Sequence, residues 1–135
     1  MSDTNGNKSA ANNGTRALIF VVDDEPMLLE LASVILSPLG YLIKTFRDPR
    51  TALQAYMEAQ PPPALLITDY AMHTMNGMEL IDACRKLQPR QKILMVSGTI
   101  DEQIYSHLAV KPDRFLAKPY QAKQLIEAVN MLVRD

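Results

Sequence analysis

Five polar residues in this sequence each follow a short apolar run. Asp23 and Asp24 follow ALIFVV, Asp69 follows ALLIT, Ser97 follows ILMV, and Lys118 follows FLA. Each of these residues is ordinary by itself, because Asp and Ser also form turns and cap helices. Taken together, three carboxylates, a hydroxyl and an ammonium are a set that suits the binding of a phosphoryl group.

An alternation of strands and helices predicts how these five residues could meet. Apolar runs typical of buried strands span 17–22, 41–46, 64–68, 93–96 and 115–117. Helical spacing predicts helices at 27–39, 49–58, 77–87, 101–108 and 121–133. This alternation favours an α/β fold, with a parallel sheet covered by helices on both faces. The carboxyl ends of parallel strands share one edge, where ligands bind, so we expect the five residues to converge there.

The chemistry of such a cluster follows from its charges. Three neighbouring carboxylates repel one another and need a cation. Mg²⁺ suits a site with few carboxylates, because it takes its other ligands from water and phosphate. Aspartate is a known nucleophile in phosphoryl transfer, a reaction that depends mainly on positioning and charge neutralisation. The sequence therefore predicts a Mg²⁺-dependent pocket for a tetrahedral dianion, with a carboxylate as the attacking group.

Composition sets limits on the class of protein. The chain has 135 residues, 47% of them hydrophobic, and a net charge of -1, which predicts a single domain with no bulk attraction to nucleic acid or membranes. No apolar stretch approaches the ~20 residues of a membrane span. The single cysteine, Cys84, excludes an intramolecular disulfide and is interpreted as a small buried residue. We expect a cytoplasmic protein without nucleic-acid or membrane partners.

The first residues differ in composition from the rest. Residues 1–16 are mostly Asn, Gly, Ser, Thr and Ala, and they lack the apolar segment of a signal peptide. Such a composition buries too little surface to order itself. We therefore predict a flexible leader over 1–16 and one folded domain over 17–135, with no output domain.

Four motifs, taken in order, resemble a known family. They are VVDDEP (21–26), LLITDY (65–70) with Met72, Met75 and Gly77 after it, ILMVSGT (93–99), and FLAKPY (115–120). Residues 16–134 resemble the receiver domain of two-component response regulators, in particular single-domain receivers of the chemotaxis-regulator kind. The resemblance implies a flavodoxin-like doubly wound (βα)5 fold, with a five-stranded parallel sheet in the order 2-1-3-4-5.

The resemblance also implies roles for the acidic residues. Asp69 would accept a phosphoryl group from a phosphohistidine of a histidine kinase or of a histidine phosphotransfer protein. Asp24 and Asp69 would bind Mg²⁺ directly, together with the backbone carbonyl of Ala71. Asp23 would act mainly through water.

Further roles concern the other strand ends. By resemblance, Lys118 would pair with the phosphoryl group and would be followed by a cis peptide bond to Pro119. Ser97 would bind a phosphoryl oxygen and shift inward, and Phe115, at the family's aromatic switch position, would turn inward with it. The switch would change the face of helix 4 (101–108), strand 5 (115–117) and helix 5 (121–133), where a downstream protein would bind.

Several residues depart from the family's pattern. Ala71 offers no polar side chain to guide the attacking water of dephosphorylation. His73 stands where the family often has proline, and it could bind a metal or carry a phosphoryl group. We interpret His73 as a solvated loop residue, because Mg²⁺ prefers oxygen ligands. Phe115 lacks a hydroxyl, and 109–113 lacks the glycine usual in that loop.

The favoured function is that of a phosphoacceptor, which catalyses only its own phosphorylation and dephosphorylation. Two other functions are alternatives to it. A phosphatase of the haloacid dehalogenase type needs a second aspartate two residues after its nucleophile, where this chain has Ala71. A pseudo-receiver would serve only as a docking module. The complete set of acidic residues, serine and lysine argues against it.

Overall fold

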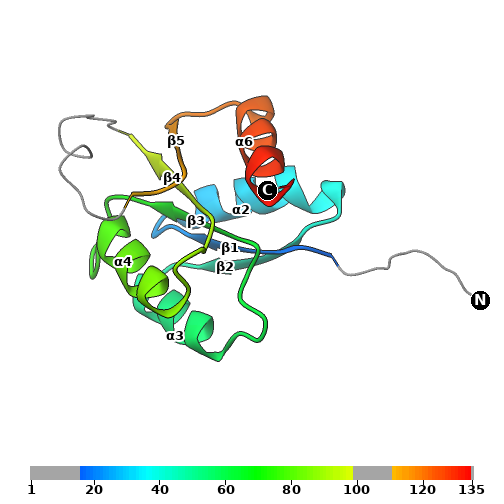
Figure 1. The fold of residues 1–135 in the computed structure, drawn as a ribbon. Helices are drawn as coiled ribbons and strands as arrows, with labels where there is room; N and C mark the ends of the chain where they lie inside the picture. The colour runs from blue at the N-terminus through cyan, green and yellow to red at the C-terminus, as the bar shows by residue number, and fades with distance from the viewer. Residues whose placement is uncertain (1–15, 99–110, 135) are drawn as a thin grey trace, which may run out of the picture.

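Five parallel strands form a single sheet. The computed structural model describes residues 16–98 and 111–134, so the leader as far as residue 15 and the helix expected at 101–108 lie outside the described residues. The strands are β1 (Leu18–Val22), β2 (Leu42–Phe46), β3 (Leu65–Asp69), β4 (Ile93–Ser97) and β5 (Arg114–Ala117). Their order is β2-β1-β3-β4-β5, and every pairing is parallel (Figure 1). The predicted doubly wound order is confirmed.

Helices cover both faces of this sheet. α2 (Pro26–Leu36) and α6 (Ala122–Arg134) lie on one face, and α3 (Pro49–Glu58) and α4 (Gly77–Leu87) lie on the other (Figure 1). In β1, Ile19 and Val21 pack into the core beneath α2 and α6, whereas Phe20 and Val22 pack beneath α3 and α4. Successive strand residues point to opposite faces, so a strand covered on both sides must be apolar throughout.

Helix α2 ends earlier than its apolar spacing predicts. The spacing predicts a helix through residue 39, but α2 ends at Leu36 and a 3₁₀ turn, η1 (Ser37–Leu39), follows. Pro38 explains the difference, because it lacks an amide hydrogen and its ring clashes with the carbonyl of the preceding turn. Gly40 then takes a left-handed conformation with φ of 98°, which glycine adopts without strain.

Side-chain caps anchor the loop between β3 and α4. Asp48, the N-cap of α3, accepts hydrogen bonds from the backbone N–H of Arg50 at 2.8 Å and from Thr74 Oγ1 at 3.2 Å. Asn76 caps α4 in a reciprocal pair of hydrogen bonds with Glu79, which satisfies two backbone donors at the start of the helix. The loop is therefore held at the β2–α3 turn and at the start of α4.

Two further sequence predictions concern burial. Cys84 is buried in the core beneath α3 and α4, as predicted, and burial raises the pKa of its thiol to about 12. Its thiol therefore stays protonated and unreactive at neutral pH. Among residues 16–98 and 111–134, no helix is both long and apolar enough to cross a membrane.

Candidate functional site

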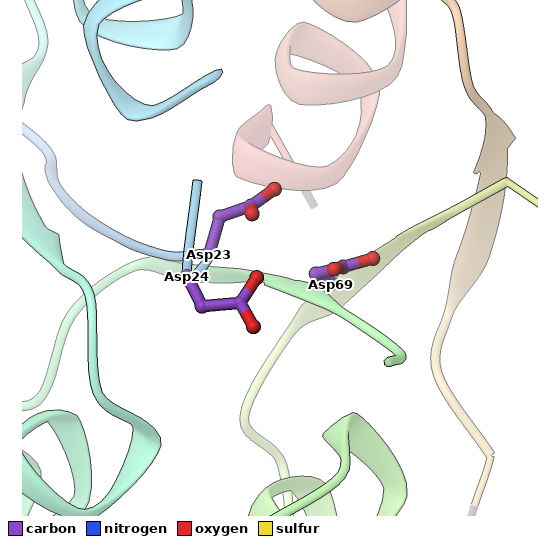
Figure 2. A group of neighbouring side chains, drawn as sticks. All are labelled: Asp23, Asp24 and Asp69. Carbon is purple, nitrogen blue, oxygen red and sulfur yellow. The ribbon is translucent and has the colours of Figure 1, made fainter. Parts of the chain in front are cut away.

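Three carboxylates meet at the carboxyl edge of the sheet. Asp23 and Asp24 follow β1, and Asp69 is the last residue of β3, the strand paired with β1. Each of the three offers an oxygen, and these oxygens all lie within 4.8 Å of one another (Figure 2). The sheet thus brings together residues that lie more than forty positions apart in the sequence.

The cluster has a buried part and an open part. Asp23 and Asp69 are only 6% and 7% exposed, whereas Asp24 is half-buried. Asp23 Oδ1 accepts a hydrogen bond from the backbone N–H of Glu25 at 2.9 Å. A ligand would therefore reach the cluster from the side of Asp24.

Lys118 supplies a positive charge to the buried part. Its Nζ lies 3.0 Å from Asp23 Oδ2 and 3.2 Å from Asp69 Oδ1. The N–H of Lys118 donates to the carbonyl of Ser97 at 2.8 Å, which holds this residue beside the end of β4. The Lys118–Pro119 peptide bond is cis. Lys118 thus pairs with two carboxylates that come from the neighbouring strands β1 and β3.

The charges of the site do not balance, because one ammonium faces three carboxylates. Burial raises the pKa of Asp69, and the charge of Asp23 adds to this effect, while Lys118 opposes it. For Lys118, burial lowers the pKa of its ammonium, but the hydrogen bonds and charges of Asp23 and Asp69 outweigh burial and raise it. The all-oxygen donor set and the missing positive charge both fit a divalent cation such as Mg²⁺.

The raised pKa of Asp69 predicts a pH-dependent stability for the metal-free protein. The unfolded chain loses this proton near the ordinary pKa of 3.8, whereas the folded protein keeps it to higher pH. Between these two pKa values the folded state binds more protons, so the free energy of unfolding falls as pH rises. Asp69→Asn removes this contribution.

Urea unfolding in the presence of a chelator measures the effect. The difference in unfolding free energy, parent minus Asp69→Asn, should decrease as pH rises from 3.8 through the folded pKa. The subtraction cancels the titration of groups that do not interact with Asp69. A difference that stays constant with pH would contradict the raised pKa.

Three further predicted residues lie in β4, in β5 and in the loop after β3. Ser97 is the last residue of β4, is buried, and pairs with Ala117 of β5. Phe115 of β5 is half-buried and packs against the core beneath α3 and α4. Ala71 lies exposed in the loop after β3. The roles of these three residues stay predictions.

Some contacts of the site were not predicted from the sequence. His73 Nδ1 lies 3.4 Å from Asp24 Oδ2, and Tyr120 lines a small cavity together with Asp23 and Asp69. The position of His73 in the loop directly after Asp69 was a usable signal. No signal marked Tyr120, because its place in the wall of this cavity depends on how the backbone turns after Lys118.

Comparison with known proteins identifies the family. The profile of the response regulator receiver domain matches residues 19–130. The chain belongs to this family, and it is a receiver domain of the two-component type.

Individual relatives agree with this assignment. The DNA-binding response regulator MtrA of Mycolicibacterium smegmatis is 31% identical over 88% of this chain, but the match covers only 51% of MtrA. The chemotaxis protein CheY of Thermotoga maritima is 28% identical, with 83% of this chain and 93% of CheY covered. The structure of the response regulator TrrA of Thermotoga maritima, in complex with Mg²⁺–BeF, has a TM-score of 0.76 and 29% identity, with 86% and 98% coverage. The chain spans about half the length of MtrA.

Proposed function

We propose that Asp69 accepts the phosphoryl group of this receiver domain. The observation that carries the proposal is its place at the end of β3, between the strands that end in the other functional residues. Asp23 and Asp24 follow β1 on one side, and Ser97 ends β4 on the other. Asp69 also contacts the ammonium of Lys118. A phosphoryl group on Asp69 would therefore have cation ligands on one side and hydrogen-bond donors on the other.

The phosphoryl transfer would proceed by in-line displacement. A carboxylate oxygen of Asp69 attacks the phosphorus, the bond to the imidazole nitrogen of the donor breaks, and the electron pair of that bond goes to the imidazole. Asp24, Asp69 and the carbonyl of Ala71 would hold Mg²⁺, with Asp23 acting through water, and the ion would neutralise phosphoryl charge. Mg²⁺–BeF binding by the related TrrA supports this choice of ion.

Ser97, Lys118 and Phe115 would respond to the new group. Lys118 would shift its ammonium from the carboxylates to the phosphoryl oxygens, and Ser97 would donate a hydrogen bond to one of them. Phe115 would then turn inward and change the face formed by β5, α6 and the helix expected at 101–108. This change of surface would be the signal.

Partners follow from the family. Response regulators interact with histidine kinases and downstream effectors. For this chain we propose a histidine kinase or a histidine phosphotransfer protein as the donor, a downstream protein at the β5–α6 face, and action in the cytoplasm. DNA binding belongs to MtrA as a whole, and it is not carried over to a chain that spans half of it. Catalysis would be limited to the chain's own phosphorylation and dephosphorylation.

Labelling of the parent protein tests the proposal. With acetyl phosphate and Mg²⁺, the intact mass should increase by one phosphoryl group, and borohydride reduction should map the modification to Asp69. A chelator should prevent the increase. Labelling elsewhere would refute the assignment of Asp69. A protein that binds neither Mg²⁺ nor beryllofluoride would be a docking module, and turnover of generic phosphate esters would indicate a phosphatase.

A further inference from the structure

His73 lies at the open side of the acidic cluster. Its imidazole Nδ1 is 3.4 Å from Asp24 Oδ2, and its side chain is 91% exposed. The next residue, Thr74, donates a hydrogen bond to Asp48 and so holds this part of the loop against the β2–α3 turn. A surface cavity of about 340 Å³ lies between this loop and the β2–α3 turn, and Asp24, Asp48 and His73 are among its lining residues. The imidazole therefore lies beside Asp24, the most exposed carboxylate of the cluster, at a cavity that Arg47 also lines.

The separation of the two donor atoms matches that of two ligands on one metal ion. Donors bound at about 2.1 Å lie about 3.0 Å apart at an octahedral angle and about 3.4 Å apart at a tetrahedral angle. The 3.4 Å between His73 Nδ1 and Asp24 Oδ2 lies at the upper end of this range. These two donor atoms are thus close enough to share an ion, although His73 lies outside the group of three aspartates whose oxygens are within 4.8 Å of one another.

We propose that His73 is a nitrogen ligand of the divalent-cation site and selects transition ions such as Mn²⁺ and Co²⁺ over Mg²⁺. The proposal rests on the proposed function, since it needs a cation at Asp24 and Asp69. Imidazole is a good ligand for transition ions, whereas Mg²⁺ favours oxygen and keeps its waters. Because the imidazole is exposed, it loses little packing against the protein when it turns toward an ion. Mg²⁺ binds through the oxygen donors alone, so His73 changes the preference among ions and not the ability to bind one.

Pulsed EPR of bound Mn²⁺ tests for the nitrogen ligand directly. The chain has two histidines, so His107→Ala is the matched control for His73→Ala. In tag-free protein, the parent and His107→Ala should show nitrogen-14 coupling to the ion, and His73→Ala should show none. Calorimetry should show the preference for Co²⁺ over Mg²⁺ falling about tenfold in His73→Ala, with Mg²⁺ affinity almost unchanged.

The outcomes separate this inference from the function on which it rests. If the ions bind without nitrogen coupling and His73→Ala keeps the parent's preference, the role of His73 is refuted while the phosphoacceptor site stands. If neither Co²⁺ nor Mg²⁺ binds, the cation site itself is refuted. The same follows if Asp69→Asn binds Co²⁺ and Mg²⁺ as well as the parent does. Coupling that persists in His73→Ala and disappears in His107→Ala would also refute the inference.

Discussion

Asp69→Asn is expected to abolish covalent labelling by a small phosphodonor. Asparagine matches aspartate in shape, but its neutral amide lacks the carboxylate nucleophile and contributes no charge to the cation site. Lys118 also loses one of its two carboxylate partners, which lie 3.0 Å and 3.2 Å from its ammonium. We expect labelling to fall by at least about a hundredfold, to the limit of detection by intact mass, and Mg²⁺ affinity to fall about tenfold.

A matched substitution outside the site controls for loss of charge alone. Asp82 lies in α4 and pairs with Lys86 on the helix surface, so Asp82→Asn should label like the parent. Asp69→Asn should stay folded, because burial raises the pKa of Asp69 and a neutral side chain thus suits the metal-free folded protein. Urea unfolding of the variant checks this. Labelling of Asp69→Asn at the parent's rate would remove this residue from the mechanism.

The fold was largely predictable because its signals are strong and local. A parallel sheet covered on both faces requires strands that are apolar throughout, and such runs are easily recognised in β1, β3 and β4. The end of α2 was less predictable, because the apolar spacing continues to Leu39 while Pro38 already prevents an α-helical turn. A local backbone restriction thus outweighed the hydrophobic pattern.

The residues of the site were predictable, but their pairings were not. Strand topology alone brings Asp23, Asp69 and Lys118 to one edge of the sheet. Sequence cannot say that Lys118 bridges two of the carboxylates, because that contact depends on side-chain directions. The same holds for His73, whose contact with Asp24 depends on how the loop after β3 is held to Asp48.

Gly77→Ala is expected to displace Asp69 and so to lower both stability and phosphoryl labelling. A Cβ at this position would overlap the backbone oxygen of Asp69 and would lie 2.9 Å from Met95 Cε and 3.1 Å from Tyr70 Cα. The methionine end can move, but the oxygen belongs to the central strand and the N–H of Gly77 is bonded to the carbonyl of Tyr70 at 2.8 Å. Either α4 or the end of β3 must therefore shift, at a cost of about 1–3 kcal/mol in unfolding free energy.

The shift should reach function as well as stability, because the clashing atom belongs to the phosphoacceptor itself. A displacement of about 1 Å at a reacting group can cost about a hundredfold in rate, so labelling of Gly77→Ala should slow by tenfold or more while the protein is still folded. Gly98→Ala is the control, since a Cβ there meets no atom of the described residues within 4 Å. Urea unfolding and acetyl phosphate labelling of both variants separate the two effects. Parent-like stability together with parent-like labelling in Gly77→Ala would show that α4 can shift without disturbing Asp69.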